Sequence, residues 1–146
     1  MHINYKAAQL ITSILGTFMI ALFIVLNVIY FYPYTVIRLN CPAIVTTKEV
    51  VPGGVLNFTL LYNKSFNVPE ILSQQLMVAD HIVNLGSNSG QLDVDANTID
   101  LKLVIPKDIH SGTGKVKILV RYKLFYGMRV VNVERETETF TIKKME

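Results

Sequence analysis

Charged residues are scarce in this sequence: Asp, Glu, Lys and Arg make up 17% of it, against roughly 25% in an ordinary soluble domain. Tryptophan is absent, and Cys41 is the single cysteine. These two shortages exclude an internal disulfide and the Cys–Trp–Cys core of antibody domains. The net charge of +3 is too small to indicate a nucleic-acid-binding surface. The 146 residues leave room for about one domain, which excludes a multidomain enzyme.

The shortage of charge is concentrated in one segment. From Ala7 to Ile37 there is no Asp, Glu, Lys or Arg, and Leu10 to Tyr32 is mostly Ile, Leu, Val, Phe and Met. About 20 apolar helical residues cross the roughly 30 Å hydrocarbon core of a bilayer. Because no Ala-x-Ala cleavage pattern follows, an uncleaved anchor is favoured over a signal peptide. We expect a short tail over 1–6, a transmembrane helix over 7–32 and a juxtamembrane linker over 33–41.

Aromatic residues at the end of this segment are typical of a membrane interface. Tyr30, Tyr32 and Tyr34 are predicted interface anchors, because tyrosine combines an apolar ring with a polar hydroxyl. The charges flanking the span nearly balance, with Lys6 on one side and Arg38 on the other. The short segment before the span favours an inside N-terminus. We therefore expect a single-pass protein whose C-terminal domain is extracytoplasmic, in a bacterial inner membrane or a virion membrane.

Small side chains recur along one face of the predicted helix. A helix–helix association face is predicted because small residues four apart let two backbones approach closely in lipid. Asn27 adds a polar amide that a partner helix could satisfy better than hydrocarbon. The alternative is that small residues are common in any span. The predicted association face consists of Ser13, Gly16, Thr17 and Ala21.

After the span, apolar and polar residues alternate with a period of two, which is typical of strands with one buried face. The clearest runs are 55–62, 98–105 and 115–124, and a first strand is expected over 43–50. Turn residues separate them: Val51-Pro52-Gly53-Gly54, a tight hairpin at Ala79-Asp80, a flexible loop over 86–90 and a long turn region over 106–114. A phase change in the last strand predicts a bulge or twist over 135–139.

These patterns predict an all-β domain over 42–146. About seven antiparallel strands in just over 100 residues favour an Ig-like β-sandwich preceded by one N-terminal transmembrane α-helix. A closed barrel of similar size is the alternative.

Several short motifs resemble those of small phage-encoded proteins that carry one membrane anchor and an Ig-like domain. The motifs are Val51-Pro52-Gly53-Gly54 before an alternating strand, Tyr62-Asn63-Lys64 at its end, Ile105 to Gly112 between later strands, and Tyr126-Gly127-Met128-Arg129 before Thr139-Phe140-Thr141-Ile142. The resemblance covers residues 50–142 by pattern. It implies a viral origin and brings no catalytic or ligand-binding residue with it.

Residues that could carry chemistry are few and scattered. His2, His81 and His110 have no metal-ligand spacing. A fold that brings His81 and His110 together is the alternative, but isolated histidines in loops or turns are more often solvated, and we expect this for both. The run Asp93 to Asn97 begins like a calcium loop, but Thr98 stands at the glycine position and Val104 at the bidentate-glutamate position. Cys41 has no nearby base. We therefore predict no enzyme activity, no metal, no cofactor and no small-molecule substrate.

Opposite charges line two consecutive predicted strands. Lys117, Arg121 and Lys123 lie on the outward face of one strand, and Glu134, Glu136 and Glu138 lie on one face of the next. If the strands pair, cross-strand ion pairs explain this pattern most simply. The other interpretation makes Lys117, Arg121 and Lys123 a partner-binding stripe.

Two classes of function fit these features. In the first, the protein is a structural or protein-interaction module that presents its domain at a membrane surface, in a phage or cell-envelope assembly. In the second, it is an accessory regulator of a membrane process and acts through transmembrane helix association. In both classes the protein contacts the lipid bilayer and binds either another protein or a second copy of this chain. Neither class includes binding of nucleic acid.

Overall fold

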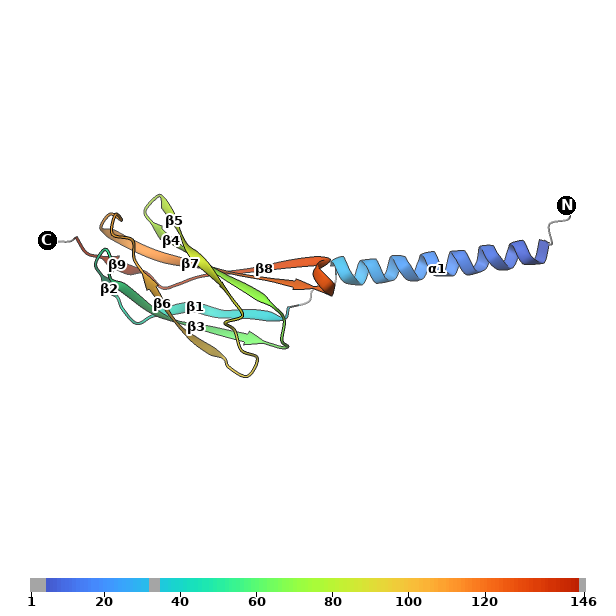
Figure 1. The fold of residues 1–146 in the computed structure, drawn as a ribbon, viewed down its shortest axis with the longest axis horizontal. Helices are drawn as coiled ribbons and strands as arrows, with labels where there is room; N and C mark the ends of the chain where they lie inside the picture. The colour runs from blue at the N-terminus through green and yellow to red at the C-terminus, as the bar shows by residue number, and fades with distance from the viewer. Residues whose placement is uncertain (1–4, 32–34, 145–146) are drawn as a thin grey trace. The chain divides into compact units, whose positions relative to one another are not determined.

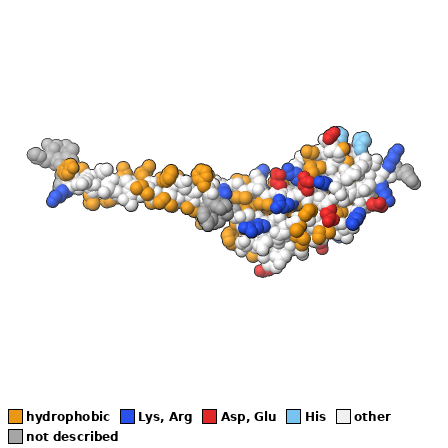
Figure 2. Space-filling model, turned by 180° about the vertical axis from the view of Figure 1, so that it is seen from behind, with side chains coloured by type: hydrophobic (Ala, Val, Ile, Leu, Met, Phe, Trp, Pro, Cys, Tyr) orange, Lys and Arg blue, Asp and Glu red, His pale blue; other side chains and the backbone are white. Residues whose placement is uncertain are grey.

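The computed structural model describes residues 5–31 and 35–144 (Figure 1). It divides into two units, one containing a helix and the other β-sheet, and each is described by itself. The first contains α1 (Tyr5–Phe31). By length and composition α1 could cross a membrane. Figure 2 shows hydrophobic side chains along α1 and interspersed positive and negative side chains over the β unit.

The β unit contains two sheets. One has the order β1-β3-β6, and the other has the order β2-β9-β7-β4-β5, with β8 also paired to β7. All pairings are antiparallel except that of β2 with β9, which is parallel. The strands are β1 (Ile37–Val45), β2 (Glu49–Val50), β3 (Val55–Lys64), β4 (Glu70–Val78), β5 (His81–Ser89), β6 (Thr98–Val104), β7 (Gly112–Leu124), β8 (Arg129–Glu136) and β9 (Phe140–Ile142).

Alternate residues of the long strands form the core. In β3 and β7 every second side chain is buried, as the period-two pattern requires. The largest fully buried side chains come from both sheets, so the two apolar faces cover one another. These side chains include Phe58, Leu60, Tyr62, Leu76, Ile118 and Tyr122.

The last strand of the sequence prediction is interrupted at Thr137. β9 pairs with the first residues of β7, and β8 pairs with the later ones, so the two lie one after the other along the same edge of β7. Between them Thr137 bridges to Ala43 of β1, and its hydroxyl accepts a hydrogen bond from the Val116 amide at 3.0 Å. The bulge or twist predicted over 135–139 takes the form of an interruption between β8 and β9, and the bridge within it joins the two sheets along one side.

A buried ion pair joins the sheets at the end where the chain enters the β unit. The Lys64 ammonium lies 2.7 Å from a Glu70 carboxylate oxygen, and both side chains are almost fully buried. Lys64 also donates to the Leu92 carbonyl at 2.8 Å, and the other Glu70 oxygen accepts from the Leu92 amide at 2.9 Å. We call Lys64, Glu70 and the Leu92 backbone the polar clamp. It holds two of the connections that cross between the sheets, β3–β4 and β5–β6.

Tyr62 extends the polar clamp by one residue along the β5–β6 connection. Its hydroxyl donates to the Asp93 carbonyl at 3.0 Å and accepts from the Asp93 amide at 2.9 Å. Burial raises the pKa of the Tyr62 phenol above its ordinary value of 10.0, and the charges of Asp93 and Glu70 act in the same direction. The phenol is therefore protonated at neutral pH and able to donate.

The structure agrees with the prediction of a mostly β domain after an N-terminal apolar helix. The tight hairpin at Ala79-Asp80 is confirmed, because Val78 pairs with His81. The prediction of a flexible loop over 86–90 is wrong, because β5 continues to Ser89. Gly86 takes a positive φ of 115° at a register shift opposite Gln74 and Gln75. A glycine that permits a bulge was interpreted as the start of a loop.

The first strand also differs from its prediction. β1 begins at Ile37 rather than at residue 43, so part of the segment expected as linker is strand. Ile37 and Leu39 are buried while Arg38 is exposed, an alternation too short to stand out beside the apolar span. Cys41 has a φ of 55° and lies where the β1–β3 register shifts, which separates the two halves of the strand.

The polar clamp gives a prediction for stability. In Lys64→Met the Glu70 carboxylate stays buried without its counter-charge, and we expect a loss of about 3–5 kcal/mol in the free energy of unfolding. The double variant Lys64→Met/Glu70→Leu should recover part of this loss, but not all, because the Leu92 amide and carbonyl lose their side-chain partners. Denaturant unfolding of the full chain in detergent measures both. An additive double-mutant cycle would contradict this coupling.

Candidate binding site

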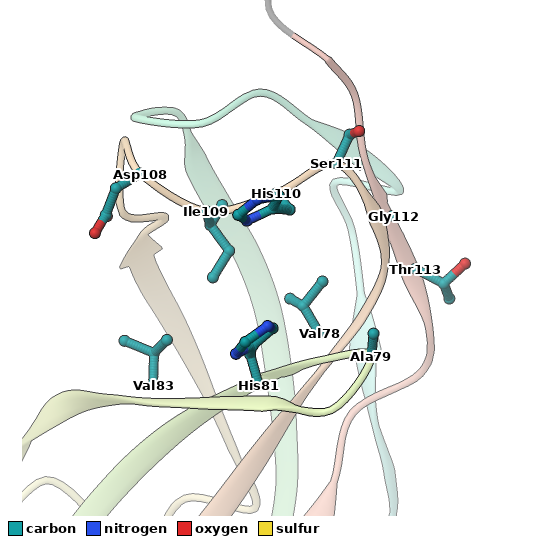
Figure 3. Close-up of a pocket in the computed structure, with 10 residues that line it drawn as sticks. All are labelled: Val78, Ala79, His81, Val83, Asp108, Ile109, His110, Ser111, Gly112 and Thr113. Atoms are coloured by element: carbon teal, nitrogen blue, oxygen red, sulfur yellow. The ribbon is translucent and has the colours of Figure 1, made fainter.

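A cavity lies at the end of the β unit opposite the polar clamp, where β4 ends and β7 begins. Its volume is about 470 Å³, within the range of ligand-binding pockets. Val78, Val83 and Ile109 supply apolar walls, and His81, His110 and Ser111 supply polar groups. Figure 3 shows the two imidazoles facing one another across the space, while the Asp108 carboxylate and Thr113 hydroxyl point away from them.

Two turns position the imidazoles. His81 follows the two-residue turn at Ala79-Asp80, where Ala79 takes a φ of 49°, a conformation that glycine adopts more easily. His110 lies on the connection from β6 to β7, whose start is fixed by backbone hydrogen bonds between Ile105 and the glycines 53 and 54. The cavity is therefore formed by two connections that lie far apart in the sequence.

The two histidines are brought together, although we expected each to be solvated separately. Their ring centroids lie 6.3 Å apart and their planes differ by 14°. Both side chains are exposed, so the imidazoles form the mouth of the cavity and not its floor. No group of three or more metal-ligating side chains occurs among the described residues, and two imidazoles alone are a weak site. The pair is better suited to contact a planar or apolar group than to hold a metal.

An open strand edge borders the cavity. β5 is the last strand of its sheet, and it carries no charged residue and no proline from His81 to Ser89. Edge strands usually carry such residues because they discourage pairing with other chains. The edge strands β6 and β8, in contrast, contain Asp100 and Lys102, and Glu134 and Glu136. The sequence did not reveal this edge, because residues 86–90 were predicted to form a flexible loop.

The backbone of β5 presents hydrogen-bonding groups outward. After a two-residue hairpin turn the residues His81 and Val83 bond to β4, so Ile82 and Asn84 direct their N–H and C=O groups to the open edge. The side chain of Val83 lines the cavity, and that of Ile82 is 65% exposed. β5 therefore combines an unpaired backbone edge with an adjoining apolar cavity.

β8 contacts two residues of the predicted basic stripe and neutralises the charge of one, Lys117. Lys117 forms an ion pair with Glu134 at 2.8 Å, and Arg121 donates to the Asn132 side chain at 3.1 Å. A further pair joins Lys115 and Glu136 at 3.1 Å, so the cross-strand pairing that the sequence suggests is present. Lys123 is exposed and lies opposite Val130. Glu138 accepts a hydrogen bond from the Val45 amide instead of facing β7.

The predicted association face lies on one side of α1. Ser13, Thr17 and Ala21 border a shallow groove together with Ile14 and Phe18, and a side chain at Gly16 would meet nothing within 4 Å. The Thr17 hydroxyl donates to the Ser13 carbonyl at 2.9 Å, and the Asn27 amide donates to the Phe23 carbonyl at 2.8 Å. These groups are satisfied within the helix, so a partner helix would add close packing.

Of the remaining predicted residues, Tyr30 lies in the last turn of α1 and is 53% exposed. Tyr32 and Tyr34, like His2, lie outside the described residues. Cys41 is exposed. The segment 93–97 makes a polar turn before β6, in which the Asp95 amide approaches the Asp93 carboxylate at 3.5 Å.

The comparisons with known proteins give no family. No protein-family model and no curated protein matches the chain. Among solved structures, the C-terminal domain of wzt has a TM-score of 0.48 at 8% identity. The match covers 77% of this chain and 75% of the wzt domain. A protein of unknown function from Porphyromonas gingivalis W83 has a TM-score of 0.45 at 9% identity, and the match covers 75% of this chain and 49% of that one.

Neutral ceramidase from Pseudomonas aeruginosa has a TM-score of 0.42 at 12% identity, covering 80% of this chain and 22% of that one. The first matches are longer proteins, of which this chain spans less than a third. With TM-scores below 0.5, these likenesses assign neither fold nor activity to this chain.

Proposed function

We propose that this protein is a membrane-anchored protein-interaction module, with α1 as the anchor and β5 with its adjoining cavity as the binding site. The observation that carries the proposal is the uncharged open edge of β5 beside an apolar cavity. An extended peptide adds to such an edge through main-chain hydrogen bonds, and a neighbouring pocket selects one side chain. The proposed partner is an uncharged extended segment with one bulky apolar side chain.

The cavity's chemistry favours binding over catalysis. Its two imidazoles have neither a nucleophile nor a third ligand positioned between them in the described residues. Apolar walls with a few polar groups at the mouth are typical of recognition sites. The proposal therefore includes no enzyme activity, no cofactor and no small-molecule substrate.

The finer architecture is part of the same proposal. The orders β1-β3-β6 and β9-β7-β4 resemble the A-B-E and G-F-C orders of an Ig-like sandwich, with β5 in the place of an added C′ strand. Such domains recur as binding modules, which supports a role in a phage or cell-envelope assembly. The fold alone does not select that role.

A second candidate function rests on the small-residue groove of α1, which favours association with another helix in the bilayer. In that case the protein regulates a membrane process through α1, and the β5 edge is not needed.

The binding proposal is tested with the full chain in lipid nanodiscs, using a displayed library of unstructured peptides as the probe. Ile82→Pro removes one outward N–H without breaking the bonds between β5 and β4. We expect it to weaken selected peptides up to about tenfold, which corresponds to the one lost hydrogen bond. His110→Ala should weaken those peptides that share an apolar anchor residue. Fluorescence anisotropy measures the affinities.

Lys123→Ala is the matched control, and we expect it to leave peptide affinity unchanged. Loss of binding in Lys123→Ala but not in Ile82→Pro would move the site to the basic stripe. Selection of no peptide, together with loss of cellular function in Ser13→Leu/Thr17→Leu/Ala21→Leu, would favour helix association instead.

The proposed orientation has its own test, because Cys41 is exposed and is the single cysteine of the chain. A membrane-impermeant maleimide added to intact spheroplasts should label Cys41 if the β unit is extracytoplasmic. Cys41→Ser is the blank. Labelling that requires lysis of the spheroplasts would reverse the orientation.

A further inference from the structure

The turn between β7 and β8 has an unusual backbone for its residues. The 3₁₀ segment η1 (Phe125–Gly127) places three consecutive residues in the left-handed region, with φ values of 52° at Phe125, 56° at Tyr126 and 91° at Gly127. Glycine adopts this conformation freely, whereas side chains with a Cβ are disfavoured there and aromatic ones are rare. Strain of this kind is common where a residue is held in place for a function.

The side chains at this turn are also unusually exposed. Tyr126 is fully exposed, and Met128 and Val130 are each 50% exposed. The Tyr126 ring lies in water, so burial of this ring does not offset the strain of its backbone. An asparagine or glycine at this position would satisfy the turn without exposing apolar surface.

The turn lies at the end of the β unit where the chain enters. The Val36 amide donates to the Tyr122 hydroxyl at 3.3 Å, and Tyr122 lies just before the turn on β7. The covalent chain from Phe31 to Thr35 can reach at most roughly 14 Å. A second exposed aromatic, Phe66 at 55%, lies next to Ser65, whose amide donates to the Val36 carbonyl at 2.9 Å. If α1 spans a bilayer, this end of the β unit stays near the bilayer surface.

Charge at this end is mixed. Arg38 and Lys123 are exposed, but Asp93 and Asp95 are exposed on the neighbouring β5–β6 connection. The partner is therefore selected by the apolar and aromatic groups of the turn. Tyrosine is suited to the headgroup region of a bilayer because its ring is apolar and its hydroxyl is polar.

We propose that the β7–β8 turn is a second membrane contact, at which Tyr126 and Met128 insert into the interface of the bilayer that α1 spans. This inference rests on the proposed membrane anchorage.

The test uses tryptophan fluorescence of the full chain in phosphatidylcholine vesicles, because the natural sequence contains no tryptophan. Tyr126→Trp places the single tryptophan at the turn. Ile82→Trp, at an exposed site on the opposite end of the β unit, is the matched control. We expect blue-shifted emission from Tyr126→Trp and quenching when the lipid carries bromine on its acyl chains, with neither effect in Ile82→Trp. Met128→Trp gives a second reporter should Tyr126→Trp fail to fold.

Flotation with the vesicles measures anchorage independently. If the chain floats but both tryptophans emit as in water, the second contact is overturned while the anchor stands. A blue shift without bromine quenching indicates a protein contact at the turn and also overturns the proposal. A chain that does not float refutes the anchor itself.

Discussion

A buried ion pair between Lys64 and Glu70 holds the β unit together where the chain passes from one sheet to the other between β3 and β4. Lys64 is the last residue of β3 and Glu70 the first of β4, so the pair closes the β3–β4 connection directly. Both side chains also bind the Leu92 backbone in the β5–β6 connection. Two buried charges are tolerated only when their remaining hydrogen-bonding capacity is used, and here the main chain of Leu92 uses it. No buried side-chain polar atom among the described residues lacks a partner.

This arrangement gives the two ends of the β unit different properties. At the entry end, hydrogen bonds hold the connecting segments in place. They are those of the polar clamp, the Tyr62–Asp93 bonds and the Val36–Tyr122 bond. At the opposite end, the cavity lies between two turns, and the neighbouring β5 edge is paired on one side only. The entry end is thus fixed by hydrogen bonds, whereas the opposite end leaves backbone groups of β5 unpaired, and the proposed function places partner binding at that open end.

Strong alternation made β3, β6 and β7 predictable, since each of them buries one face. β5 was only partly predictable, because its exposed, polar second half lacks the alternation that marks a buried face. The pairing of His81 with His110 is set by packing between distant connections, and no sequence spacing indicates it. No sequence pattern indicates the polar clamp either, because Lys64 and Glu70 lie on either side of a connection and charged side chains are rarely buried.

Amide hydrogen exchange of the full chain in nanodiscs tests the central claim, that one buried cluster holds the β3–β4 and β5–β6 connections. The Leu92 and Asp93 amides lie between strands, yet they donate to Glu70 and Tyr62. The account predicts that they exchange as slowly as core amides of β7 such as Val120, because only opening of the whole β unit exposes them. It also predicts fast exchange at Ile82 on the open edge. Exchange of Leu92 and Asp93 as fast as that of Ile82 would contradict the account.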